Sequence, residues 1–164
     1  MSFEETGLIE EDTMRGRYIT FRVDGQVYGI QIRYVTEIIG VQPINRLPEM
    51  PSYVKGIINL RGRIIPVVDM RLKFKRPEAE YNEKTCILVI DNPVVTAGLI
   101  VDEVADVLTI SEEDTSPAPS FAGGAAYLEG VGKVGKEVQL LLDCEALFSG
   151  EEATALTHAA RKGE

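Results

Sequence analysis

The chain has 164 residues, of which 45% are apolar and 26% charged, and its formal net charge is −9. This composition is typical of a globular protein with one domain or two small ones, and the negative charge argues against general binding to nucleic acid or to anionic membranes. No apolar run approaches the roughly 18 residues of a membrane span, and the acidic N-terminus does not resemble a secretory signal, so we expect a cytoplasmic protein without direct membrane insertion.

Cysteine and histidine are too few for the usual metal or catalytic sites. Cys86 and Cys144 lie in apolar runs without a CxxC motif, which indicates buried reduced thiols rather than a disulfide or a ligand pair. The single histidine, His158, provides no triad, metal site or phosphoacceptor core. The GxGxxG, GxxxxGK[ST] and GxSxG motifs are absent from the sequence. We therefore expect no enzyme activity, no metal and no cofactor.

In chain order, the predicted elements are mainly strands. Residues 1–15 are expected to form a flexible tail. Alternating apolar residues on either side of Asp24-Gly25 predict a β-hairpin. Residues 33–40 fit either a helical turn or the entry to a strand, and the three prolines within 42–54 favour a loop or an edge strand.

A second hairpin is predicted from residues 57–68. Two apolar runs, 57–60 and 64–68, flank the sequence RGR, with the bend at Arg61-Gly62. Asp69 is well placed to cap a short helix that begins after it. We interpret the basic residues that follow, within 71–76, as a solvated segment.

The second half of the chain repeats the first. Residue 29 matches 98, a displacement of 69 positions that holds through residue 39, and residues 54–74 match 128–148 with a displacement of 74. Glycines, acids and apolar residues agree in the same order, which indicates a duplicated, strand-dominated unit of about 70 residues. Units this small should pack together as closed barrels and share a core, with a groove at their seam.

The tip of the second hairpin carries the sharpest interaction candidate. The Arg61 guanidinium could pair with a carboxylate on a partner or with Glu37 of the same chain. A turn residue that only confers solubility would look the same. Glu37 matches Asp106 in the repeat, so its acidity could also be inherited.

Five further positions can be interpreted either as structural residues or as parts of a binding site. Val35 and its repeat equivalent Val104 are typical core residues when each is considered alone. Gly56, Gly98 and Gly130 interrupt strand-like runs, which is typical of bulges or of close backbone approach.

Three segments of the chain resemble the CheW family of bacterial chemotaxis coupling proteins: residues 19–39, 52–74 and 98–110. The resemblance extends from about Tyr18 to Phe148. Its most specific part is the string V-K-G-I-x-N-L-R-G-x-I-x-P-V-x-D-x-R, which is shared mainly by CheW, by the regulatory domain of the histidine kinase CheA and by CheV-type proteins. The chain has no room for a kinase core or a receiver domain, so a stand-alone adaptor is expected.

The resemblance implies a mainly β fold of two intertwined, SH3-like five-stranded β-barrels, with a few short helices and a hydrophobic core between the barrels. Residues 16–150 would form a single CheW-like domain, with subdomains at roughly 16–80 and 81–150 and strand exchange allowed between them. Residues 151–164 would form a C-terminal tail for which a helix is one option.

The resemblance also implies the function. CheW-like proteins join the cytoplasmic hairpin tips of chemoreceptors to the regulatory domain of CheA, and they catalyse no reaction. A pseudo-symmetric contact between their barrels and those of CheA uses the outer edges of each subdomain, where no individual residues are assigned. The positions that match the receptor-binding groove of the family are Val35, Glu37, Gly56, Arg61, Gly98, Val104 and Gly130.

Two alternatives remain open from the sequence. A CheW-like adaptor could serve a different chemosensory array, such as one that controls pili or development, because only the partners differ. A small β-barrel that binds nucleic acid or a ligand is the alternative from another class. That class should show a basic stripe interleaved with aromatic residues, whereas this chain has a net charge of −9 and no tryptophan.

Overall fold

A computed structural model describes residues 16–117, 127–148 and 150–162. The flexible tail expected at 1–15 lies outside the described residues. The fold is mainly β, as predicted. In chain order the strands are β1 (Arg17–Val23), β2 (Gln26–Gln31), β3 (Val35–Gly40), β4 (Val54–Leu60), β5 (Arg63–Asp69), β6 (Cys86–Asp91), β7 (Thr96–Val101), β8 (Glu103–Thr109), β9 (Thr115–Pro117), β10 (Leu128–Val134) and β11 (Glu137–Leu142). The helical segments are η1 (Ile32–Tyr34), α2 (Met70–Lys73), η2 (Glu112–Asp114) and α3 (Gly150–Lys162).

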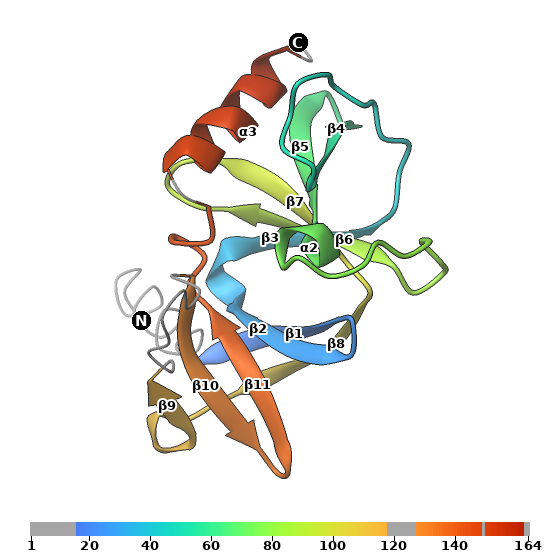
Figure 1. The fold of residues 1–164 in the computed structure, drawn as a ribbon. Coiled ribbons are helices and arrows are strands. Elements are labelled where there is room, and N and C mark those ends of the chain that lie inside the picture. Colours follow the sequence, from blue (N-terminus) through green and yellow to red (C-terminus); the bar gives the residue numbers. More distant parts are fainter. Residues whose placement is uncertain (1–15, 118–126, 149, 163–164) are drawn as a thin grey trace, which may run out of the picture.

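The strands form two sheets, which lie one above the other in Figure 1. The five-stranded sheet has the order β3-β6-β7-β5-β4, and the six-stranded sheet has the order β8-β1-β2-β11-β10-β9. The sixth strand is the three-residue β9 at the edge. Neighbouring strands are antiparallel except in two pairs, β2 with β11 and β5 with β7, which are parallel.

Each sheet contains strands from both halves of the chain. Strand β3 pairs with β6, and β8 pairs with β1. As a result, the five-stranded sheet uses strands from 35–101, while the six-stranded sheet combines strands from both ends of the chain. This exchange intertwines the two barrels. A boundary near residue 80 therefore separates the two repeats of the sequence but does not separate the two sheets.

The repeat is also visible in the strand register. In the two parallel pairs, Val67 lies opposite Gly98 and Leu141 lies opposite Gly29. The two glycines are equivalent positions of the repeat, and so are Val67 and Leu141. The duplication predicted from the sequence is therefore present in the strand pairing.

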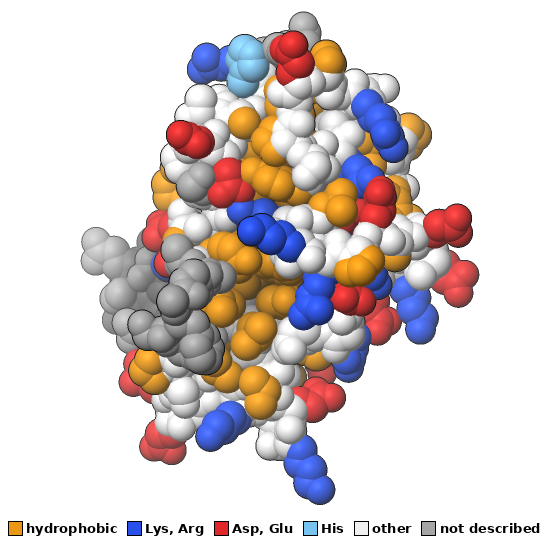
Figure 2. Space-filling view, in the orientation of Figure 1, with side chains coloured by type: hydrophobic (Ala, Val, Ile, Leu, Met, Phe, Trp, Pro, Cys, Tyr) orange, Lys and Arg blue, Asp and Glu red, His pale blue; other side chains and the backbone are white. Residues whose placement is uncertain are grey.

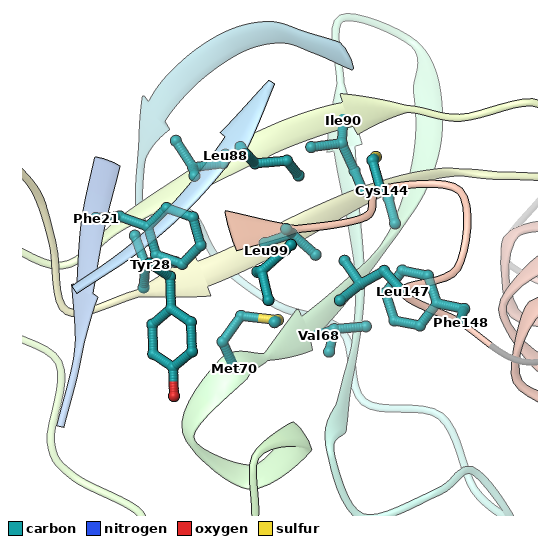
Figure 3. Packing of buried hydrophobic residues seen from close by; sticks show 14 of the residues in the cluster. Phe21, Tyr28, Val68, Met70, Leu88, Ile90, Leu99, Cys144, Leu147 and Phe148 are labelled. Atoms are coloured by element: carbon teal, nitrogen blue, oxygen red, sulfur yellow. The ribbon is translucent and has the colours of Figure 1, made fainter. Parts of the chain in front are cut away.

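The largest apolar cluster lies between the two sheets. It includes Phe21 and Tyr28 from the six-stranded sheet and Leu88 and Leu99 from the five-stranded sheet, whose side chains converge in Figure 3. Burying one such side chain contributes roughly 1.5–3 kcal/mol relative to leaving it in water. Two smaller clusters lie elsewhere, one in each sheet, so the shared core expected from the resemblance is the main one.

Local sequence signals explain the turns and the first helix. Asp24 and Gly25 connect β1 and β2 with φ values of 48° and 82°, the left-handed pair that a tight hairpin requires. The Asp69 carboxylate accepts hydrogen bonds from the backbone N–H of Arg71 and Leu72 and thereby caps α2, as predicted. Residues 33–40 contain both of the predicted alternatives, because the turn η1 leads directly into β3.

The interpretation of 71–76 as a solvated segment is wrong for two of its basic residues. The Lys73 side chain is only 7% exposed and the Arg71 side chain 21% exposed, and both form ion pairs. The reason is the short helix α2, which turns these two side chains toward the junction of the sheets. Lys75 and Arg76, which follow the helix, are exposed.

Both cysteines are free, with Cys144 buried and Cys86 partly buried. Among the described helices, none combines the length and the apolar character that would let it cross a bilayer.

Candidate protein-docking site

The tip of the β4–β5 hairpin contacts the opposite edge of the five-stranded sheet. Arg61 donates a hydrogen bond from Nη2 to Oε2 of Glu37 on β3. The turn is further supported by Gly62, whose backbone N–H donates to Oδ1 of Asn59 at 2.8 Å. Because β3 and β4 are the two outermost strands of this sheet, the ion pair helps to close it into a barrel.

The Arg61 side chain is accessible, but its backbone is strained. Its side chain is 70% exposed, against 29% for that of Glu37, and its φ of 52° is left-handed. A residue with a β-carbon pays roughly 1–2 kcal/mol in this conformation. The arrangement presents a guanidinium, with five N–H donors, at the rim of a barrel.

Gly56 allows the loop after β3 to close over β4. Asn45 in that loop exchanges two backbone hydrogen bonds with Ile57, each 2.9 Å long. At Gly56, φ is +146° and a β-carbon would lie 2.1 Å from the carbonyl oxygen of Asn45. No other residue fits there without moving the loop.

Gly98 and Gly130 are also buried at close approaches. A β-carbon at Gly98 would lie 2.7 Å from Cγ2 of Ile87, and one at Gly130 would lie 2.9 Å from the carbonyl oxygen of Ser116. These glycines, like Gly56, have no side chain to offer to a partner. Their contribution to a binding site is to set the shape of the barrels.

Val35 and Val104 occupy equivalent places on the exchanged strands. Val35 of β3 pairs with Ile90, and Val104 of β8 pairs with Phe21. Both valines are partly buried and pack against the core between the sheets. Each lies beside a shift in strand register, at the bulge where its strand leaves the central core.

The seven predicted positions are thus divided between the sheets. Val35, Glu37, Gly56, Arg61 and Gly98 belong to the five-stranded sheet or its turns, and Val104 and Gly130 belong to the six-stranded sheet. Glu37 and Arg61 are in direct contact, and the two valines share one core. Their assembly into a single receptor groove stays a prediction.

Two exposed apolar residues were missed by the sequence reasoning. Ile38 on β3 is 46% exposed and Val107 on β8 is 41% exposed, and they are equivalent positions of the repeat. Both strands are edges of their sheets. The alternation of side chains along these segments was the available signal, because residue 38 must point away from the face that 37 and 39 line.

A second missed feature is an ion-pair network at the junction of the sheets. Arg71 donates to both carboxylate oxygens of Asp102, at 2.9 and 2.7 Å, and to Oδ1 of Asp24 at 3.3 Å. The hydrogen bond to Asp102 raises the pKa of the Arg71 guanidinium above its ordinary value. Since Asp24 lies in the β1–β2 turn and Arg71 in α2, the network joins the two sheets.

The described residues contain no group of three or more His, Cys, Asp or Glu side chains that could hold a metal ion. The accessible features of the candidate site are instead a guanidinium at a hairpin tip and apolar residues along two edge strands. This chemistry is suited to contacts with other proteins.

Comparison with known proteins agrees with these features. Two exchanged β-barrels with a common core define a double-barrel β-protein. A family model described as a CheW-like domain matches residues 17–152, and the chain belongs to the CheW family.

Three relatives illustrate the similarity. The chemotaxis protein CheW of Klebsiella aerogenes is 36% identical over 152 residues, which cover 92% of each chain. The crystal structure of a scaffolding protein, CheW from Thermoanaerobacter tengcongensis, superposes with a TM-score of 0.76 at 31% identity and covers 82% of this chain and 92% of that one. The protein PilI of Pseudomonas aeruginosa is 33% identical over 86 residues, which cover 52% of this chain and 48% of PilI.

Proposed function

We propose that this protein is a chemotaxis adaptor that couples the cytoplasmic hairpin tips of chemoreceptors to the histidine kinase CheA. The observation that carries the proposal is the alignment with a chemotaxis protein CheW over 92% of both chains. The description of the similar crystal structure as a scaffolding protein supports the same role. In this role the protein acts in the cytoplasm, at receptor arrays, and catalyses no reaction.

The receptor contact would combine shape and charge. Apolar residues beside Val35 and Val104 would bury against a helical hairpin, at roughly 25 cal/mol per Å² of apolar area removed from water. Arg61, held by Glu37, would form the charged rim, which sets orientation and discriminates among partners more than it adds affinity. The three glycines would act indirectly, by fixing the barrel surfaces.

The kinase contact would use the outer edges of the barrels. Strands β3 and β8 lie at the ends of their sheets and present Ile38 and Val107. An edge strand with exposed apolar side chains favours pairing with another β-domain. Barrels of the CheA regulatory domain are such partners.

A second candidate function is suggested by the similarity to PilI. The chain could serve a chemosensory array that controls pili instead of flagellar chemotaxis. The PilI alignment covers about half of each chain, whereas the Klebsiella aerogenes alignment covers 92% of each, so we favour the chemotaxis array.

The proposal is tested by reconstitution. The purified protein is mixed with membranes that contain a chemoreceptor and with CheA from the same organism, and the membranes are sedimented. We expect kinase to sediment with the membranes only when the adaptor is present. If the adaptor and the kinase both stay in the supernatant, the proposal is wrong. Affinity purification from the native lysate distinguishes the two arrays, because the receptors that co-purify identify the pathway.

A further inference from the structure

The most unusual charged group outside the candidate site is the ammonium of Lys73, at the end of α2. Its side chain is 7% exposed and forms an ion pair with Oε2 of Glu152 on α3. The hydroxyl of Tyr53 donates to the same oxygen at 2.6 Å. A buried ammonium is costly unless it is paired, so the position of Lys73 depends on α3.

Three aromatic rings complete the surroundings of this ammonium. The Lys73 Nζ lies 5.1 Å from the ring centroid of Tyr53, 5.3 Å from that of Phe148 and 5.5 Å from that of Tyr127. All three distances fall within the range of a cation–π interaction. Figure 3 shows Phe148 next to Leu147 at the margin of the central core. The rings come from segments that precede β4, β10 and α3, so the lysine is the common neighbour of both barrels and the helix.

The internal repeat shows that a lysine is not required for packing here. With the displacement of 74 positions, Lys73 is equivalent to Leu147 and Tyr53 to Tyr127. Leu147 is fully buried in the central core. Replacing a buried ion pair by apolar residues is often neutral or stabilising. Lys73 therefore makes the interior selective for one partner, the carboxylate of Glu152, at a place where a leucine would pack.

Helix α3 connects the two barrels. It follows β11 of the six-stranded sheet, and it packs on β5 and β4 of the five-stranded sheet, as the red helix against the upper sheet in Figure 1 shows. It buries Ala153, Leu156 and Ala159, of which two are alanines with little apolar surface. A helix of 13 residues is marginal in water by itself, so a released α3 would unfold.

We propose that α3 is a releasable latch between the two barrels, and that the pairing of Lys73 with Glu152 closes it. When α3 is docked, the ammonium is paired and the helix adds a further link between the intertwined barrels. When α3 leaves, the ammonium keeps its aromatic neighbours but loses its carboxylate. A helix that is partly docked in another register would leave the ammonium unpaired, so the latch has two states. The inference goes beyond the adaptor function and needs no partner protein.

Hydrogen–deuterium exchange on the full chain tests the latch. We expect amides of α3 to exchange faster than those of the central strands β6 and β7, because α3 opens locally. The change Glu152→Gln should speed exchange in α3 at least tenfold and leave β6 and β7 within twofold. In the Lys73→Leu background the same change should speed amide exchange in α3 less than threefold, because the positive charge that required Glu152 is gone.

The Lys55–Glu78 pair supplies a matched control. It also joins a lysine to a glutamate, but Lys55 lies on β4 and the pair does not involve α3. Glu78→Gln should leave exchange in α3 unchanged. Equal acceleration of α3 and the central strands by Glu152→Gln would overturn the proposal, because the pair would then stabilise the whole fold. The proposal would also be overturned if Glu152→Gln left the exchange rate in α3 unchanged. The same holds if Glu152→Gln sped exchange in α3 equally with Lys73 and with Lys73→Leu.

Discussion

The two hairpins that the repeat makes equivalent differ at their tips. In the β4–β5 hairpin the first turn residue is Arg61, with a φ of 52°, and in the β10–β11 hairpin it is Gly135, with a φ of 61°. Glycine adopts this left-handed conformation freely, whereas arginine does so at a cost. The acids at the equivalent positions 37 and 106 differ too: Glu37 pairs with Arg61, while Asp106 accepts a hydrogen bond from the backbone N–H of Val107 at 2.8 Å.

The difference between Arg61 and Gly135 helps to distinguish residues that the fold requires from residues that a partner would contact. Glycine occupies the equivalent left-handed position in the other barrel, so the backbone conformation at this position does not require an arginine. A strained residue with an exposed guanidinium is more readily explained by a contact that the side chain makes. The barrels thus share one framework, and we expect the five-stranded one to carry the charged part of the receptor site.

The largest expected effect on stability comes from a comparison of Gly56 with its repeat equivalent Gly130. At each of these glycines a neighbouring segment packs closely on the barrel. Gly56→Ala should lower the free energy of unfolding by about 3 kcal/mol, because the added carbon meets a backbone carbonyl and the φ is unfavourable. Gly130→Ala should cost only about 1 kcal/mol, since the short strand β9 can move aside. Urea unfolding of both variants measures the difference. Equal losses would show that the two closures are equally rigid.

A smaller effect is expected at the tip itself. Arg61→Gly places at the first turn position the residue that the second hairpin has there, and it removes the cost of a left-handed arginine. An exposed ion pair is worth only about 0.5 kcal/mol. The variant should therefore be as stable as the wild type or up to about 1 kcal/mol more stable in urea unfolding. A loss of 2 kcal/mol or more would mean that the Arg61–Glu37 pair is essential for barrel closure.

The smallest expected effect concerns the buried thiols in alkaline solution. Burial raises the pKa of the Cys144 thiol to about 12. A thiol whose pKa is higher in the folded state stabilises the fold below its unfolded pKa, and this contribution is lost as the pH rises toward the folded value. Unfolding free energies should hence fall by about 1 kcal/mol between pH 8.5 and 9.5.

Two cysteine variants show which thiol causes this loss of stability with rising pH. Cys144→Ala should flatten the decline above pH 8.5. Cys86→Ala should flatten it less, because the Cys86 thiol is only partly buried and a backbone hydrogen bond at Val104 opposes the rise of its pKa. The comparison uses the slope of stability against pH within each variant, so the packing cost of either substitution cancels. Equal slopes in all three chains would contradict the assignment.

Much of the fold could be predicted because its signals are local. The Asp24-Gly25 turn, the cap at Asp69 and the repeat follow from neighbouring residues or from equal spacing. The exchange of β3 and β8 between the sheets could not be predicted from such signals. An edge strand has the same alternation whichever sheet it joins, and the choice is decided by contacts across the whole chain.

The candidate site was predictable only in part for a similar reason. Arg61 and Glu37 were recognised as a pair that could form, and the structure joins them. Lys73 looked like one charge among several in a basic segment. Its burial depends on aromatic rings and on a helix that lie far away in the sequence, so no local pattern revealed it.

The most direct test of the adaptor account is receptor control of CheA in reconstituted membranes that contain Arg61→Ala, with Arg63→Ala as the control from the same hairpin. Kinase activity is measured with and without the receptor ligand. We predict that Arg61→Ala folds normally and lowers the ligand-controlled activity at least tenfold, while Arg63→Ala keeps it within twofold of the wild type. Ligand control at the wild-type level with Arg61→Ala would contradict the account.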